Sequence, residues 1–389
     1  MKRLPGLDLL RALAIVWVML FHTYLIGGLG PYWGWLERYG WMGVDLFFAL
    51  SGLLIGRQVL APLARGERLD FGDFYLRRAL RILPALWVVL ALYLAFPALR
   101  ERPGLEPWWK FALFVFNVTA DYRNPAFSQV WSLCVEEHFY LLFPALAVLL
   151  VPRLRSRGFL GLCIVLVVAG VVLRAGIWMA DTQAQQLGAP ERNWFVEDLY
   201  YPTWSRLDGL LGGVMLAALQ VFRPDAWRRW QRRADAVLVA GLTLVGLAMW
   251  LFRERTGLIG NAVGWPVLSA GMVMLVFAGA ERNSLIGRWR VPCAGWLALA
   301  SYSLYLTHKI AFGLVDRGFG QALEGHAWLA VAAYAGASLF AGALLHYAVE
   351  QPGLRLRARW QRLRSGLRGG VGRAGLVERS DAAEQGSRA

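Results

Sequence analysis

Residues 9–29 read LLRALAIVWVMLFHTYLIGGL, an apolar run long enough for one helix to cross a membrane, which takes about 20 residues. Nine similar runs follow, at residues 41–60, 82–99, 128–151, 159–179, 203–222, 236–252, 259–279, 295–314 and 328–348. The 389-residue chain is 57% hydrophobic and 17% charged, against roughly 45–50% and about 25% in soluble domains. This composition excludes a disordered chain and a soluble nucleic-acid-binding protein. It predicts an all-α, polytopic membrane helix bundle with about ten transmembrane helices.

The distribution of charge predicts the side of the membrane on which each loop lies. The 41 Lys and Arg outnumber the 26 Asp and Glu, which gives a net charge of +15. Basic residues cluster before the first run, in every second loop and in the C-terminal tail. The positive-inside rule therefore predicts that both termini are cytoplasmic. The apolar segment 108–120 is too short to span, and we expect a re-entrant or interfacial helix on the outer side.

The two ends of the chain differ in character. Residues 1–352 hold all the apolar runs and predict one membrane domain, whereas residues 353–389 are rich in Arg and predict a mostly disordered cytoplasmic tail. The N-terminus resembles a signal peptide, but Asp8 and Arg11 interrupt its apolar core and no cleavage site follows. We expect it to be retained as the first helix. A disulfide framework or a metal site is not expected from three scattered cysteines, Cys134, Cys163 and Cys293.

The first run carries two ionisable residues, Arg11 at its cytoplasmic edge and His22 beyond the midplane. They are 11 residues apart, so they return to nearly the same helix face, separated by roughly 16 Å of rise. Ionisable groups inside a membrane usually mark function. Alternatively, Arg11 snorkels to lipid phosphates and His22 bonds a neighbouring helix. We favour a proton-transfer role for His22, because an imidazole is a poor packing group there.

The fourth run repeats polar residues at a helical spacing. Ser132, Glu136 and Tyr140 recur every four residues and therefore share one face. Glu136 should lie about 10 Å deep, close to the expected depth of His22. A carboxylate at that depth could orient the imidazole and raise its basicity. The alternative is a buried structural carboxylate bonded to Ser, Tyr or Arg.

Basic residues at the cytoplasmic entry of the third helix predict an anion site. Arg78 and Arg81 are three residues apart, so their guanidinium groups can converge on one anion, and Arg11 lies at the same membrane face. The alternative is an ordinary positive-inside flank. For four further polar residues inside the runs we favour packing or helix–helix hydrogen bonds: His308, Asp45, Arg206 and Asp208. The last two, Arg206 and Asp208, could form a local ion pair.

These motifs occur in a fixed order along the chain: Arg11-x10-His22, Gly43-Val44-Asp45 with Ser51-Gly52, Arg78-x-x-Arg81, Trp131-Ser132-x3-Glu136-x3-Tyr140, Arg206-x-Asp208, Tyr302 to His308, and Val349-Glu350-x-Pro352. Together they resemble the bacterial acyltransferase-3 family of integral membrane O-acyltransferases, over about residues 4–355. Two positions depart from the pattern, His138 where Gln is usual and Cys134 where a small residue is usual.

The resemblance implies a ten-helix domain in the bacterial inner membrane. It also implies transfer of an acyl group, commonly acetyl, from cytoplasmic acyl-CoA to a hydroxyl on the far side. Acceptors of the family include envelope polysaccharides, peptidoglycan and macrolides. We expect no metal, and membrane lipids but no nucleic acid among the partners.

The charges suggest how such a transfer would proceed. Arg11, Arg78 and Arg81 would bind the phosphates of acyl-CoA, with acetyl-CoA the expected co-substrate. His22 would act as general base or carry the acyl group transiently, and Glu136 would orient it. The rival function is a transporter or flippase of a lipid-linked glycan, which would share the polar interior. Against it, the sequence has no internal repeat of useful period, and consumption of acyl-CoA would distinguish the two.

Overall fold

The computed structural model describes residues 4–360 except 29, 31–32 and 191. Over these residues it is built from helices, which are α1 (Pro5–Phe21), α2 (Gly34–Tyr39), α3 (Gly43–Ala64), α4 (Phe71–Ala95), α5 (Trp108–Ala112), α6 (Val130–Gln186), α7 (Asp208–Phe222), α8 (Pro224–Gln231), α9 (Ala234–Leu251), α10 (Trp265–Gly279), α11 (Leu285–Arg288), α12 (Ala294–Leu323) and α13 (Ala327–Leu345). Shorter turns join them: η1 (His22–Ile26), η2 (Gly40–Met42), η3 (Pro97–Leu99), η4 (Phe116–Val118) and η6 (Thr203–Ser205) are 3₁₀ turns, and η5 (Phe195–Tyr200), η7 (Gly260–Gly264) and η8 (His346–Glu350) are π-helical.

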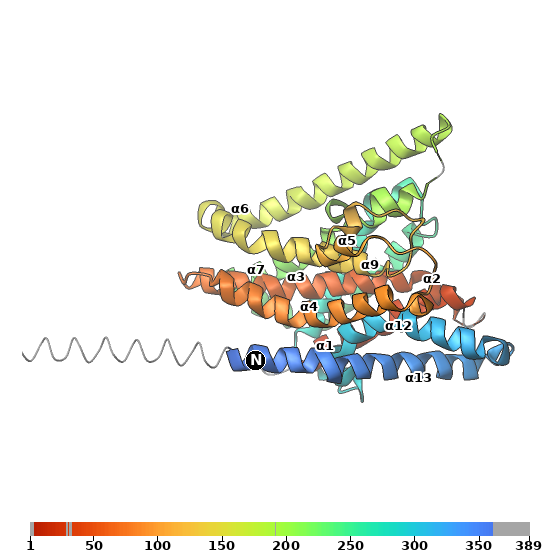
Figure 1. Ribbon diagram of the computed structural model, residues 1–389. Helices are drawn as coiled ribbons and strands as arrows, with labels where there is room; N and C mark the ends of the chain where they lie inside the picture. Colours follow the sequence, from red (N-terminus) through yellow and green to blue (C-terminus); the bar gives the residue numbers. More distant parts are fainter. Residues whose placement is uncertain (1–3, 29, 31–32, 191, 361–389) are drawn as a thin grey trace, which may run out of the picture.

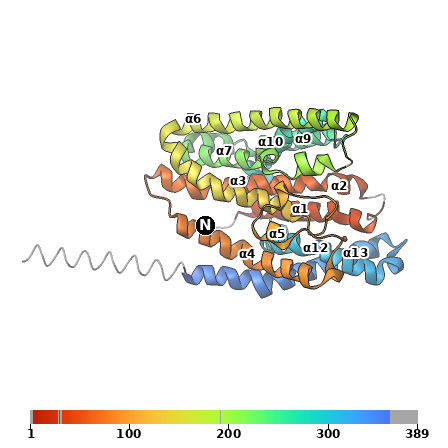
Figure 2. The same ribbon diagram turned by 45° about the horizontal axis from the view of Figure 1, so that its top comes forward.

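The long helices lie side by side in one bundle, and α1 begins at the same end at which the helix that follows η8 finishes (Figures 1 and 2). Each predicted apolar run coincides with a helix, and α6 accounts for two of them because it folds back between Leu154 and Ser156 (Figure 1). Within the described residues, eight helices are long and apolar enough to cross a membrane by length and composition. The all-α membrane bundle predicted from the sequence is therefore confirmed.

Two predicted segments have a more detailed structure than expected. The stretch 108–120 forms two short turns, α5 and η4, whose Phe111 and Phe116 rings are buried and stack with their centres 4.9 Å apart. It does not cross the bundle. Residues 351–360 continue the helix beyond η8, so the first part of the predicted tail is helical, and residues 361–389 lie outside the described residues.

The end of α1 places its histidine at a change of backbone geometry. Pro5 starts the helix at a position where its missing N–H costs nothing. The α-helix ends at Phe21, and His22 opens the 3₁₀ turn η1, which Gly27 closes with a left-handed φ of 80°. His22 therefore lies at the junction of two helix types, away from the end of α1 that carries Arg11.

Glycines allow the tightest helix contact, between α3 and α7. A Cβ on Gly213 of α7 would lie 2.3 Å from the carbonyl oxygen of Ala49 and 2.6 Å from the amide nitrogen of Leu53. A Cβ on Gly52 of α3 would lie 2.1 Å from the carbonyl oxygen of Leu210. Membrane helices associate mainly by such close backbone packing, because lipid removes the hydrophobic driving force. This contact fixes α3, which lines both cavities described below.

We predict that Gly213→Ala destabilises the protein, because the added methyl group overlaps the α3 backbone and the two helices must separate. The expected cost is about 1–3 kcal/mol, measured as a lower Tm of the detergent-solubilised protein. The matched control is Gly246→Ala in α9, where a Cβ meets nothing within 4 Å. That control should leave the Tm unchanged or raise it slightly. Equal effects of the two substitutions would contradict the packing role.

Candidate functional site

The bundle contains two adjoining cavities. The first, here called the arginine cavity, has a volume of about 330 Å³ and is lined by α1, α3, α4, α6 and α12. The second, here called the aromatic cavity, has a volume of about 1070 Å³ and reaches the loops at the opposite end of α1. Six residues singled out from the sequence line the arginine cavity, namely Arg11, Arg78, Arg81, Ser132, Glu136 and Tyr140. Helical spacing alone predicted that the last three share a face, and this is confirmed.

Three guanidinium groups surround a single carboxylate in the arginine cavity. Both oxygens of Glu136 are occupied, because Ser51 Oγ donates to Oε1 at 2.7 Å and the Tyr140 hydroxyl donates to Oε2 at 2.9 Å. The Arg78 guanidinium lies over the Tyr140 ring, with Cζ 4.9 Å from its centre. The lining therefore has a net positive charge that suits a polyanion such as a phosphate ester. Within the described residues, no three His, Cys, Asp or Glu side chains gather as a metal site would need.

The predicted pairing of Glu136 with His22 is wrong. Glu136 bonds Ser51 and Tyr140 and lines the arginine cavity, whereas His22 lines the aromatic cavity. Similar depth along two helices does not bring their side chains together, because it leaves their lateral positions undefined. Glu136 therefore faces the arginine cavity rather than the imidazole.

His22 instead pairs with His308 of α12. Nδ1 of His22 lies 3.0 Å from Nε2 of His308 and 3.0 Å from the carbonyl oxygen of Val18, while Nδ1 of His308 lies 3.0 Å from the carbonyl oxygen of Leu304. A carbonyl only accepts, so with both rings uncharged each Nδ1 carries a proton and Nε2 of His308 accepts from His22. This pattern leaves Nε2 of His22 unprotonated. It is the atom that could accept a proton or attack a carbonyl carbon.

The two cavities adjoin at Val44 and Tyr305, which line both of them. The Tyr305 hydroxyl donates to the carbonyl oxygen of Gln129 at 2.8 Å and lies 2.6 Å from Ser132 Oγ. These bonds fix the ring of Tyr305 between α12 and α6. A layer of only a few side chains, which includes Val44 and Tyr305, therefore separates the two cavities.

The aromatic cavity combines rings with charge. Its lining includes two carboxylates and four cations, which are Arg38, Arg102, Arg255 and Lys309. Nine aromatic side chains other than histidine also line it, namely Phe21, Tyr24, Trp41, Tyr122, Trp131, Phe195, Tyr200, Tyr201 and Tyr305. Lys309 Nζ donates to Ser128 Oγ at 2.9 Å and lies 3.5 Å from Glu101 Oε1. Flat rings and fixed charges suit a ligand that has both apolar faces and polar groups, such as a sugar chain.

Two buried ion pairs join the helices beside these cavities. Arg206 donates to both oxygens of Asp45 at 2.9 and 3.1 Å, and Arg174 donates to both oxygens of Asp208 at 2.8 and 3.1 Å. The predicted local pair between Arg206 and Asp208 is therefore wrong. Arg206 precedes α7 and turns toward α3, whereas Asp208 opens α7 and faces α6. Asp45 and Asp208 hold helices together, as predicted for these residues.

The sequence motifs do not point to three charged residues in or beside the cavities, Arg174, Arg255 and Lys309. Arg174 and Lys309 lie within predicted apolar runs, so the rule that an intramembrane charge marks a function or an ion pair would have found both. Arg255 lies in a loop between α9 and η7, where an arginine carries no such signal. His308 was expected to serve packing or a helix–helix hydrogen bond, and its Nε2 lies at hydrogen-bond distance from Nδ1 of His22, 3.0 Å away.

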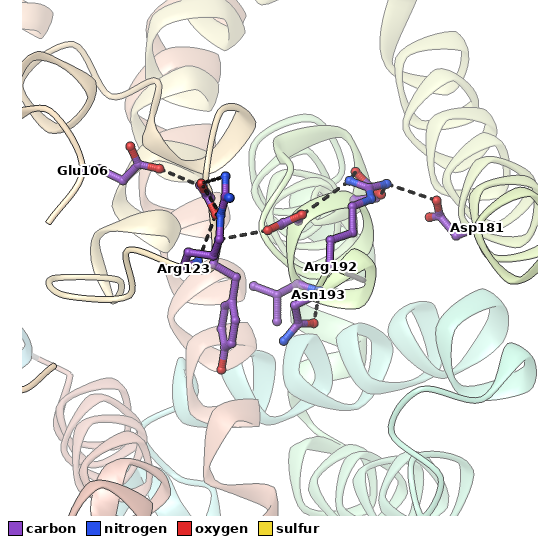
Figure 3. A network of polar contacts seen from close by, with 10 residues as sticks. Glu106, Arg123, Asp181, Arg192 and Asn193 are labelled. Atoms are coloured by element: carbon purple, nitrogen blue, oxygen red, sulfur yellow. Dashed lines mark hydrogen bonds and ion pairs between the residues drawn. The ribbon is translucent and has the colours of Figure 1, made fainter. Parts of the chain in front are cut away.

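A network of charged loop residues borders the aromatic cavity (Figure 3). Glu106 accepts from the amide of Asp121 at 2.8 Å, and Arg192 lies 3.3 Å from Asp181 and 3.4 Å from Glu197. Arg123 bonds the side chain of Asp121 and lowers the pKa of that carboxyl from 3.8 to about 2. The pair therefore stabilises the loop at neutral pH, and this contribution is lost only as the pH falls from about 4 toward 2. The amide of Tyr122 donates to Oε1 of Glu197 at 2.9 Å, so the network ties the segment after α5 to η5.

Comparison with known proteins agrees with this arrangement. The chain is 25% identical over 332 residues to the O-acetyltransferase OatA of Staphylococcus aureus, a match that covers 79% of this chain and 50% of the relative. It is 26% identical over 338 residues to the peptidoglycan O-acetyltransferase OatA of Listeria monocytogenes, covering 79% of this chain and 49% of that protein. The chain thus spans about half the length of the curated relatives it matches.

No solved structure matches the chain at a significant level. The family model described as an acyltransferase domain matches residues 4–347, which include every helix that lines the two cavities. The resemblance expected from the motifs is therefore confirmed, and the chain belongs to the acyltransferase-3 family of multi-pass membrane proteins.

Proposed function

We propose that this protein is an O-acyltransferase that moves an acyl group, with acetyl the expected one, from acyl-CoA to a hydroxyl of an envelope glycan. The observation that carries the proposal is the pair of adjoining cavities, one lined by three arginines and the other by an imidazole with a free Nε2. The names of the relatives, which are O-acetyltransferases and in one case a peptidoglycan O-acetyltransferase, support acetyl transfer and a glycan acceptor. The bacterial inner membrane is the location that fits this reaction.

The arginine cavity would bind the charged end of the donor. Arg11, Arg78 and Arg81 offer several N–H donors to phosphate oxygens, and guanidinium groups bind phosphate in a forked geometry. The start of α1 and the start of α4 carry these arginines, and the charge pattern of the loops assigns that end of the bundle to the cytoplasm. Acyl-CoA would therefore enter from the side on which it is made.

The thioester would reach the second cavity between Val44 and Tyr305. There Nε2 of His22 would take the proton of the acceptor hydroxyl while the hydroxyl oxygen attacks the thioester carbonyl carbon. The new C–O bond forms, the C–S bond breaks, and the sulfur of CoA leaves and receives the proton from His22. His308 would hold the ring in the tautomer that this step requires. The acyl group would cross the membrane without the donor or the acceptor crossing it.

A covalent route would use the same atom. Nε2 of His22 would attack the thioester carbonyl carbon, the C–S bond would break, and CoA would leave as the thiolate. In a second step the acceptor hydroxyl would take the acyl group from Nε2, and the proton of that hydroxyl would pass to the thiolate. Incubation with labelled acyl-CoA and no acceptor, followed by mass spectrometry of the protein, separates the two routes. A flippase would consume no acyl-CoA at all.

Substitution of the cavity arginines should weaken donor binding. We predict that Arg78→Gln raises the KM for acyl-CoA by about 10- to 100-fold, because each lost hydrogen bond to a phosphate contributes about 1.5–3 kcal/mol. Steady-state assay of the purified protein at saturating acceptor measures this effect. Arg229→Gln on the exposed face of α8 is the matched control and should leave the KM unchanged. An unchanged KM for Arg78→Gln would show that the cavity does not bind the donor.

Substitutions of the two paired histidines should distinguish a catalytic role for His22 from a positioning role for His308. We predict that His22→Ala lowers kcat by about 10²-fold or more, because the proton acceptor is lost. His308→Leu should lower kcat by about tenfold with an unchanged KM for acyl-CoA, and His308→Gln should recover part of this loss, because its side-chain oxygen can still accept from His22. His326→Ala, at an exposed position before α13, is the control. Normal product formation by folded His22→Ala protein would refute the mechanism.

Acyl transfer should be sensitive to the size of the side chain at the junction of the two cavities. We predict that Val44→Trp lowers acyl transfer by about 100-fold while the Kd for CoA stays within about twofold of the wild-type value, because the indole blocks the thioester after the phosphates have bound. Val16→Trp on the exposed side of α1 adds the same ring away from both cavities and should be active. Equal losses of CoA binding and of transfer in Val44→Trp would contradict a path through this junction.

A further inference from the structure

Arg255 places an uncompensated positive charge against the aromatic cavity. It lies in the loop between α9 and η7 and lines the same cavity as His22. Its Nε is buried and has no hydrogen-bond partner, and within the described residues its guanidinium makes no ion pair. A buried donor without a partner destabilises the protein, and more so when it is charged. The arginine is therefore placed as if a ligand supplied the missing acceptor.

Aromatic rings surround this guanidinium. Its Cζ lies 5.1 Å from the ring centre of Phe21, 5.2 Å from that of Trp41, 5.6 Å from that of Phe195 and 5.0 Å from that of Tyr200. Cation–π attraction stabilises the side chain in place, but a ring face offers no hydrogen-bond acceptor to the N–H groups. The rings hold the fork of donors in position and leave its hydrogen bonds available.

The loop that carries Arg255 is itself fixed. The Asn261 side chain donates to the carbonyl oxygens of Arg255 at 3.0 Å and of Gly257 at 2.9 Å. The carbonyl oxygen of Asn261 accepts in turn from Nε of Arg174 at 3.0 Å. The backbone of the loop is thereby connected to the buried ion pair between α6 and α7. A preorganised donor of this kind loses little entropy when it binds a ligand.

The fully buried arginines at this end of the bundle show what the half-buried Arg255 lacks. Arg206 and Arg174 each donate to both oxygens of an aspartate. Of the further cations that line the cavity, Lys309 is bound by Ser128 and Glu101, and Arg38 donates to the carbonyl oxygen of Arg253. Arg255 differs from Arg206, Arg174 and Lys309 because no anion among the described residues pairs with it, and from Arg38 because its guanidinium has no hydrogen-bond acceptor there.

We propose that Arg255 binds an anionic group of the acceptor, a carboxylate or a phosphate, while His22 acts on a hydroxyl of the same molecule. This inference rests on the proposed function for the identity of the ligand as acceptor. It deepens that function by making the acceptor a negatively charged glycan or a glycan on a phosphate-bearing carrier. A neutral sugar chain would fill the cavity and leave the guanidinium uncompensated.

Equilibrium binding of three probes to the purified full-length protein tests the proposal. The carboxylate probe is a tetrasaccharide of alternating N-acetylglucosamine and N-acetylmuramic acid, the phosphate probe is N-acetylglucosamine 1-phosphate, and the neutral probe is a tetramer of N-acetylglucosamine. Each is titrated against the wild type, Arg255→Gln, Arg255→Lys and the control Arg123→Gln, whose arginine is 89% exposed and lies outside the lining of the cavity.

We expect Arg255→Gln to weaken binding of an anionic probe by about tenfold or more and to leave the neutral probe unchanged. Arg255→Lys should retain part of the affinity, since it keeps the charge and loses the fork. Selective loss for the tetrasaccharide assigns a carboxylate, and selective loss for the sugar phosphate assigns a phosphate. The proposal is overturned if the wild type prefers neither anionic probe, or if all probes lose affinity equally. Because binding requires no acyl-CoA, failure of acyl transfer would leave this result standing.

Discussion

A charge between membrane helices is costly unless it meets an opposite charge, because lipid cannot solvate it as water does. In this protein two such pairs, Asp45 with Arg206 and Arg174 with Asp208, connect α3, α6 and the start of α7. Removal of either partner would leave a buried charge, so these contacts constrain how the helices can be arranged. The cavities lie beside this framework. The charges that line the cavities are distinguished from these four residues because they take no part in the two ion pairs.

In the proposed reaction, the two cavities would divide the chemistry between them. The arginine cavity has the charge for phosphate groups and one carboxylate that Ser51 and Tyr140 hold in place. The aromatic cavity has an imidazole whose tautomer follows from a backbone carbonyl on each histidine. Neither cavity alone contains the groups needed both to bind a coenzyme and to activate a hydroxyl. Val44 and Tyr305 line both cavities, so the cavities lie close together. In the proposed reaction, this closeness would allow a donor bound in the arginine cavity to reach the imidazole in the aromatic cavity.

Much of this arrangement could be predicted from the sequence, and the exceptions share a physical cause. The spans follow from hydropathy, and the convergence of Ser132, Glu136 and Tyr140 follows from helical periodicity. The partner of His22 could not be predicted, because periodicity places a residue on its own helix and not between helices. Arg206 and Asp208 are two residues apart in sequence and bind different helices for the same reason. Arg255 has no sequence signal, since only the folded chain brings four rings around it.

The layer formed by Val44 and Tyr305 has a consequence for the cell as well as for the reaction. A continuous file of water through the bundle, bordered by histidines and carboxylates, would conduct protons and discharge the electrochemical gradient across the membrane. Bonds from the Tyr305 hydroxyl to the carbonyl oxygen of Gln129 and to Ser132 keep the ring between the two cavities. A passage that admits a slender thioester arm only when that arm fills it would keep the membrane electrically tight throughout each turnover.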